Sequence, residues 1–174
     1  RPRTIQWVTG LSRHCVLHSV YGAVHPPRGR PAYLVDRVFR ATLREQAELA
    51  AVMVSYRALA AEGFPPARSL IAAYRQYRSF TAEPSVDFDR AFYLACQLDG
   101  IWACRRASVA LARCRQCGSQ HVVPLGAQDG RECALCRSLA RPEPRRKAPG
   151  SPPRMHGPES DLAGDEFWAV TEHI

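Results

Sequence analysis

The sequence has almost no lysine and no long apolar run. Lys147 is the only lysine, so arginine supplies nearly all of the positive charge in a chain of 174 residues with a formal net charge of +8. No stretch approaches the length of a membrane span, and none has the pattern of a secretory signal peptide. We therefore expect no contact with a membrane. Seven cysteines in a chain of this kind favour a reducing compartment, and the predicted location is the cytoplasm.

The sequence also lacks the pattern of a nuclease active site, which needs paired carboxylates or histidine beside an open metal site. Asp87 and Asp89 have no histidine or metal motif nearby. Helix capping explains these two carboxylates better than catalysis does. The chain is therefore predicted not to be an enzyme. Because it begins at Arg1 without a methionine, we expect its natural N-terminus to lie further upstream.

The most specific motif is a double Cys-x-x-Cys, formed by Cys114 with Cys117 and by Cys133 with Cys136. Fifteen residues separate the two pairs, a spacing typical of a tetrahedral zinc site. Four thiolates leave no coordination position for water, so the predicted cofactor is one structural zinc ion per chain. Two disulfides, or unrelated thiols, are the alternative. Short strands are expected over Ser108–Ala112 and Gln120–Pro124, which makes the predicted module a zinc ribbon.

Apolar residues at helical spacing dominate the rest of the chain and predict a mainly α protein. Helices are expected from Asp36 to Glu62, from Pro66 to about Phe80, and after the cap at Asp87. On the second of these, Leu70, Ile71, Tyr74 and Tyr77 are expected to face inward, and the free cysteines Cys15, Cys96 and Cys104 are expected to be buried. The predicted organisation is a helical domain over 1–100, a zinc-ribbon module over 101–140 and a disordered tail over 141–174.

The N-terminal segment fits a helix-turn-helix pattern. A first helix ends over Ile5–Val8, Thr9–Leu11 makes the turn, and Ser12 is a good N-cap for a second helix. Apolar residues up to Val24 form one face of that second helix. Arg13, His14 and His18 lie on another face, near the end at which a recognition helix contacts base edges. An ordinary amphipathic helix after a glycine turn fits the same residues equally well.

Arginine makes bidentate contacts with phosphates and guanine edges, so a basic chain of this composition favours a nucleic-acid partner. Basic residues beside the second helix, in the proline-rich connector His25–Pro31, in the zinc module and at the start of the tail are placed to hold phosphates. A solvated basic loop is the alternative for the connector. The candidate DNA-contacting residues are Arg13, His14, His18, Arg28, Arg30, Arg113, Arg115, Arg145, Arg146 and Lys147.

Taken together, these features resemble the FlhC family of bacterial flagellar transcription activators over about Thr9 to Lys147. The motifs that carry the resemblance, in chain order, are Leu11–Arg13 leading into Tyr21, Pro26–Gly29, Ala73–Tyr77, Arg90–Phe92, the double Cys-x-x-Cys and Arg145–Lys147. The resemblance implies a mainly helical protein with a four-cysteine zinc site, whose ligands would be Cys114, Cys117, Cys133 and Cys136.

The resemblance also implies partners. Proteins of this family form a hetero-oligomer with an FlhD subunit, bind double-stranded DNA upstream of flagellar class II promoters and recruit RNA polymerase. Divergent FlhC-like activators switch on transfer genes of mobile elements, so two regulons stay open. A zinc-stabilised adaptor without DNA contacts of its own is a further alternative. We also expect the helices between Asp36 and Leu98 to carry more apolar surface than the chain alone can cover, as an interface would.

Overall fold

The computed structural model describes residues 1–26, 35–127 and 132–140. Every element below belongs to one compact unit that begins at Arg1. Five predicted DNA-contacting residues and the predicted tail over 141–174 lie outside the described residues. These five are Arg28, Arg30, Arg145, Arg146 and Lys147.

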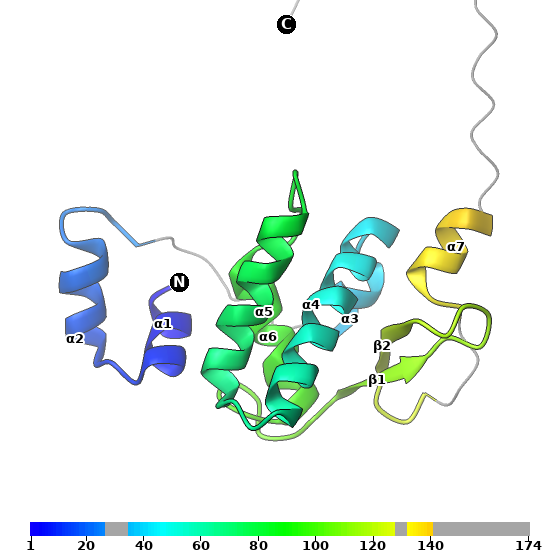
Figure 1. The fold of residues 1–174 in the computed structure, drawn as a ribbon. Helices are drawn as coiled ribbons and strands as arrows, with labels where there is room; N and C mark the ends of the chain where they lie inside the picture. Colours follow the sequence, from blue (N-terminus) through cyan, green and yellow to red (C-terminus); the bar gives the residue numbers. More distant parts are fainter. Residues whose placement is uncertain (27–34, 128–131, 141–174) are drawn as a thin grey trace, which may run out of the picture. The chain divides into compact units, whose positions relative to one another are not determined.

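The described part of the chain is mainly helical, with one small sheet (Figure 1). None of its helices is long and apolar enough to cross a membrane. The elements in order are α1 (Pro2–Thr9), α2 (Arg13–Val16), the π-helical turn η1 (Leu17–Tyr21), α3 (Val35–Arg40), α4 (Leu43–Ala61), α5 (Pro66–Phe80), α6 (Phe88–Asp99), β1 (Val109–Arg113), β2 (Gln120–Pro124) and α7 (Ala134–Ala140).

A turn separates α1 from the short helix α2, but a helix-turn-helix unit stays a prediction. Gly10 ends α1 in the left-handed conformation, with φ of 72°, and the Ser12 side chain accepts a hydrogen bond of 3.2 Å from the backbone N–H of Cys15. The predicted apolar face is only partly correct. Val16 is buried, but the side chains of Val20 and Val24 are 54% and 70% exposed because the helix changes to π-helical turns and ends at Gly22. The use of this segment as a DNA-reading unit stays a prediction.

The predicted single helix from Asp36 to Glu62 is wrong, because the chain forms two helices there. A capping box starts α4: Thr42 accepts from the backbone N–H of Glu45, and the Glu45 carboxylate accepts from the backbone N–H of Thr42 at 3.0 Å. The side-chain amide of Gln46 donates to the carbonyls of Phe39 and Ala41, which α3 leaves without helical partners. Local capping therefore overrides the continuous apolar spacing.

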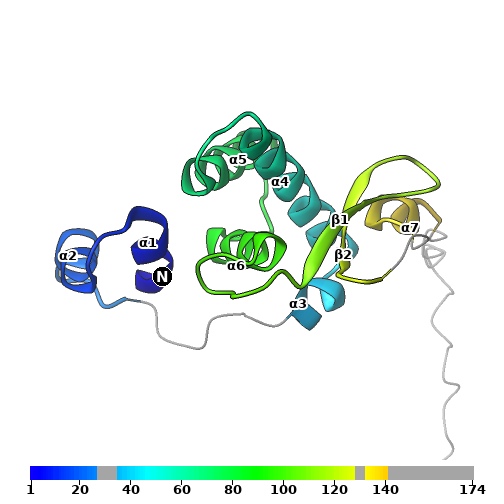
Figure 2. The ribbon, with the colours of Figure 1, turned by 90° about the horizontal axis from the view of Figure 1, so that it is seen from below.

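Three helices, α4, α5 and α6, enclose the main core, and Figure 2 shows α6 alongside the other two. The predicted caps and the start of α5 at Pro66 are confirmed: Asp87 accepts a hydrogen bond of 2.7 Å from the backbone N–H of Arg90 at the start of α6. Two burial predictions fail. Ile71 is 38% exposed instead of facing inward, and Cys15 and Cys104 are half-buried. The largest fully buried side chains are those of Tyr56, Phe92, Met53, Leu70 and Leu94.

An aromatic stack ties the N-terminal helix to this core. The ring of Phe92 on α6 is stacked with that of Trp7 on α1 and with that of Trp102 beyond α6, at centroid distances of 5.8 and 5.2 Å. The Thr4 hydroxyl donates a hydrogen bond of 2.5 Å to the carboxylate of Asp89. Helix α1 is therefore held both by ring contacts and by a charge-assisted hydrogen bond.

The sheet is the antiparallel hairpin β1–β2, in which Val109 pairs with Pro124 and Arg113 pairs with Gln120. Both predicted strands are confirmed, the first shifted by one residue. The hairpin contacts α6 through β1 and α4 through β2, and α7 also packs on α4. This arrangement brings the turn of the hairpin and the start of α7, which carry the two Cys-x-x-Cys pairs, to one side of the helical core.

Candidate metal centre

The first pair of cysteines lies in the tight turn that joins β1 to β2. The backbone N–H of Cys114 donates to the carbonyl of Ser119 at 2.8 Å, and that of Gly118 donates to the carbonyl of Cys114 at 2.9 Å. Gly118 has a φ of 72°, a left-handed conformation that a side chain would strain. Gly118 therefore supplies the backbone conformation that the turn needs after its second cysteine. The second pair begins at Cys133, and α7 carries its last member, Cys136.

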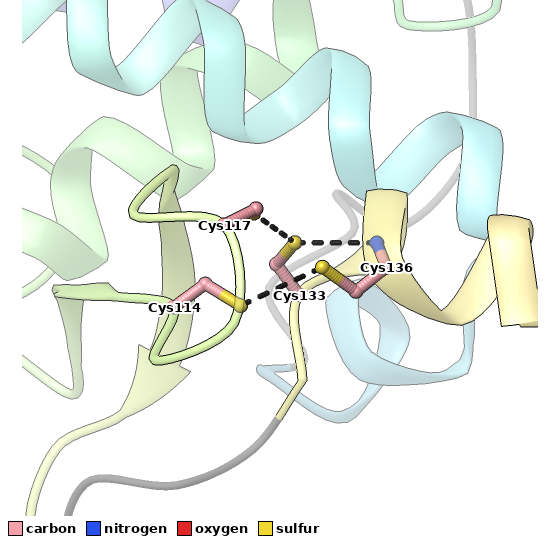
Figure 3. Close-up of side chains that lie close together, drawn as sticks. All are labelled: Cys114, Cys117, Cys133 and Cys136. Carbon is pink, nitrogen blue, oxygen red and sulfur yellow. Dashed lines mark hydrogen bonds between the residues drawn. The ribbon is translucent and has the colours of Figure 1, made fainter.

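All four cysteines of the motif come together as predicted. Their sulfur atoms lie within 4.8 Å of one another, so the group can hold a metal ion. Figure 3 shows the two pairs facing each other, with Sγ–Sγ distances of 3.4 Å for Cys117 and Cys133 and 3.8 Å for Cys114 and Cys136. A tetrahedron with zinc–sulfur bonds of about 2.3 Å places its sulfur atoms about 3.8 Å apart. The separations therefore suit a four-thiolate site.

The disulfide alternative does not agree with this geometry. A disulfide needs two sulfur atoms about 2 Å apart, and all seven cysteines of the chain are free. Moreover, the nearest sulfur neighbours come from different Cys-x-x-Cys pairs, which is the arrangement expected when both pairs share one ion.

The environment of the first pair favours the thiolate form. Hydrogen bonds from the backbone of Cys133 and Cys117 lower the pKa of the Cys114 thiol to about 6. The side chain and backbone of Ser119 lower the pKa of Cys117 by the same kind of interaction. The second pair differs: burial raises the pKa of Cys133, and the neighbouring Cys117 thiol, followed by burial, raises that of Cys136. A bound cation would offset both effects, because metal ligands must be deprotonated.

Cys114, Cys133 and Cys136 are buried, and they form a small cluster separate from the main core. No aliphatic side chain belongs to that cluster within the described residues. Cys117 is exposed at the edge. The module therefore has little apolar burial of its own to stabilise it, and a metal ion is the natural source of the missing free energy.

The predicted DNA-contacting residues that the structure describes are all exposed, but they lie on separate elements. Arg113 and Arg115 flank Cys114 of the cysteine cluster. Arg13, His14 and His18 lie on α2 and η1, where the two imidazole rings are stacked with their centroids 6.1 Å apart. The structure thus groups these residues into two sets, one beside the cysteines and one at the N-terminal helices.

One residue of this region was not predicted. The guanidinium of Arg137 on α7 donates a hydrogen bond to the side-chain oxygen of Gln46 on α4, and this bond attaches the cysteine module to the helical core. No motif could have indicated the pair, since 91 positions separate the two residues.

A comparison with protein-family models found no match, and neither did a search of the curated proteins. The resemblance to the FlhC family therefore rests on the order and spacing of the motifs quoted above, and membership stays a prediction.

Proposed function

We propose that this chain is a zinc-stabilised, DNA-binding subunit of an FlhC-like transcription activator. The observation that carries the proposal is the four-cysteine cluster with exposed arginines, Arg113 and Arg115, on both sides of the ligand Cys114. A closed thiolate site fixes the backbone of the turn that carries Cys114 and Cys117, and thereby the Cα positions of both arginines. Rigidly placed arginines are suited to hold backbone phosphates.

In this proposal the other parts have separate roles. Arg13 and His14, exposed at the start of α2, read base edges, while Arg145, Arg146 and Lys147 add electrostatic attraction. The assembled protein recruits RNA polymerase to flagellar class II promoters, with transfer genes of a mobile element as the alternative regulon. Its location is the cytoplasm, and it is not an enzyme.

The proposed partner is an FlhD-like subunit, and exposed aromatic side chains support a protein partner of this kind. Phe64, in the loop before α5, is 52% exposed, and Phe80 at the end of α5 is 82% exposed. Large apolar side chains at such exposure often belong to an interface. The same observation also favours the second candidate, an adaptor that binds only proteins.

A salt titration of DNA binding separates the two candidates. A phosphate-holding subunit loses affinity steeply as salt rises, and the logarithmic slope reports the number of neutralised phosphates. Replacing Arg113 and Arg115 together by alanine should flatten that slope by about two units, since each contact contributes about one. The matched control replaces Arg68 and Arg75, two exposed arginines of α5. Each protein is measured with and without coexpressed FlhD-like subunit, which is expected to raise solubility and affinity.

The recognition of DNA base sequence by α2 needs a separate measurement. Arg13→Ala should relax the preference at one base pair by about 1–3 kcal/mol, whereas replacing Arg145, Arg146 and Lys147 should weaken binding to all sequences alike. If Arg13→Ala binds every site as the parent does, α2 is only a packing helix. Absence of any salt-dependent DNA binding, with partner and zinc present, would leave the adaptor as the function.

A further inference from the structure

A cavity of about 660 Å³ lies between the cysteine module and the helical core. Its lining comes from α3, α4, β2 and α7, elements that can be followed in Figure 2. Pockets for small organic ligands have volumes of about 300–1,000 Å³ and occur preferentially where two structural parts meet. The cavity agrees with both tendencies, and none of the four cysteine ligands except Cys133 lines it.

Most of the cavity wall is apolar and is formed by small side chains. Ala47, Ala51 and Val54 line it from α4, and Val122 and Leu135 line it from β2 and α7. Ala51 is exposed although it lies midway along the longest described helix. The small size of these α4 side chains creates the space, and an apolar body fits against them.

His121 on β2 gives this cavity a polar group that lacks a partner. Neither ring nitrogen is accessible to solvent, and neither has a hydrogen-bond partner among the residues that the structure describes. Buried polar nitrogens without partners are rare in native proteins and costly. Because His121 also lines the cavity, its ring is available to pair with a polar group bound there.

Arg137 adds a positive charge at the same place. Its hydrogen bond goes to the neutral amide oxygen of Gln46, and both residues line the cavity. No ion pair found in the described part of the chain involves Arg137. A carboxylate accepts a stronger hydrogen bond from a guanidinium than an amide does. Among the described residues of the lining, Glu132 is the one acidic side chain, and it is exposed to water.

We propose that this cavity binds a small amphipathic organic anion. The apolar body packs against Ala47, Ala51 and Val54, and the acid group lies between Arg137 and His121. The ligand would contact α4, β2 and α7 at once and so stabilise the docking of the cysteine module on the core. This inference does not depend on DNA binding, so it can hold or fail apart from the proposed function.

Three naphthalene probes test the proposal, since they share one apolar body and differ in charge: naphthoate, naphthylmethanol and naphthylmethylamine. Each is titrated into the purified chain and followed by amide NMR shifts and by calorimetry. We expect naphthoate to bind most tightly, with shifted amides in β2 and along the Ala47–Val54 face of α4. The imidazole resonances of His121 should move with the same titration curve.

Two substitutions locate the site. Ala51→Leu fills the cavity, and His121→Phe keeps the ring but removes its nitrogens, so each should weaken naphthoate binding by about tenfold or more. The matched control is Ala58→Leu, the same change at an exposed position of α4 outside the cavity, which should bind as the parent does. Circular dichroism and metal content show whether each variant is folded.

The outcomes are distinct. Tightest binding of naphthoate with loss in either folded cavity variant supports the proposal. No binding of naphthoate to the parent chain, tighter binding of the amine, or unchanged affinity in a folded Ala51→Leu or His121→Phe protein overturns it. If one variant fails to fold, the comparison of the three probes on the parent chain and the affinity of the other variant still test the proposal.

Discussion

The guanidinium of Arg137 hydrogen-bonds to the side-chain oxygen of Gln46, whose amide nitrogen donates to the carbonyl of Ala41 at 2.8 Å and to that of Phe39 at 3.3 Å. One glutamine therefore joins α7 to the turn between α3 and α4. Both ends of its amide are used, and each bond replaces a contact with water. The cysteine module is therefore held on α4 by specific hydrogen bonds as well as by apolar contacts.

This pairing predicts coupled stability effects. Arg137→Ala should lower the free energy of unfolding by about 1 kcal/mol, because it removes one side of this hydrogen bond. Gln46→Ala should lower it by more, because it also removes the bonds to the carbonyls of Phe39 and Ala41. The double variant should lose less than the sum of the single losses. Urea unfolding of the four proteins measures the cycle. Strict additivity would mean that the hydrogen bond contributes nothing.

The geometry of the cysteine cluster predicts one zinc ion per chain. Replacing Cys114, Cys117, Cys133 or Cys136 by serine should abolish stoichiometric zinc and unfold the hairpin and α7, since metal binding and folding are coupled in such modules. Elemental analysis together with amide NMR spectra measures both effects. Cys15→Ser and Cys104→Ser are the controls, because neither thiol belongs to the cluster. A chain purified under reducing conditions without metal would contradict the assignment.

The capping box at Thr42 predicts a local stability effect. Thr42→Ala removes the acceptor for the Glu45 backbone N–H and should cost about 1 kcal/mol, whereas Thr42→Ser keeps the hydroxyl and should cost much less. Thermal unfolding of the two variants and the parent makes the comparison. Equal losses for alanine and serine would indicate packing of the threonine methyl group as the cause instead.

Glu48 predicts a dependence of stability on pH. Although burial alone acts to raise its pKa, hydrogen bonds from Ser85, Tyr77 and Arg44 lower the pKa of Glu48 from 4.5 to about 2. The Ser85 hydroxyl and backbone N–H donate at 2.6 and 2.9 Å, and the Arg44 Nε donates at 2.8 Å. A depressed folded-state pKa stabilises the protein above the unfolded pKa. This contribution is lost as the pH falls from 4.5 toward about 2.

The corresponding experiment uses Glu48→Gln, which cannot ionise. Its free energy of unfolding should be lower than that of the parent at neutral pH, and the difference should shrink as the pH is lowered through that window. Glu62→Gln, at the exposed end of α4, is the control and should follow the parent. A difference between Glu48→Gln and the parent that stays constant from neutral pH to pH 2 would assign the effect to shape rather than charge.

Local patterns in the sequence predicted the features that depend on neighbouring residues. The Cys-x-x-Cys knuckles, the strands around them and the caps at Ser12 and Asp87 each follow from residues a few positions apart. The Thr-x-x-Glu signature of Thr42 and Glu45 is also local and marks the start of α4, but the prediction of one helix from Asp36 did not use it.

The remaining features depend on tertiary packing, which the spacing of apolar residues does not determine. Ile71 has the helical spacing of a core residue, but it is 38% exposed in the structure. Two features arise only where the cysteine module packs against α4: the hydrogen bond between Gln46 and Arg137, and the cavity lined by His121. A polar pair 91 positions apart has no period or motif that could have indicated it.

The contacts of α1 also set an order of events during synthesis. Thr4 bonds to Asp89, 85 positions later, and Trp7 is stacked with Phe92. Helix α1 leaves the ribosome well before α6, the helix on which it packs, has been made. Its apolar and hydroxyl groups are therefore exposed to the translation machinery, and to any chaperone bound there, until α6 emerges. The N-terminal segment therefore cannot complete its packing until α6 has been made.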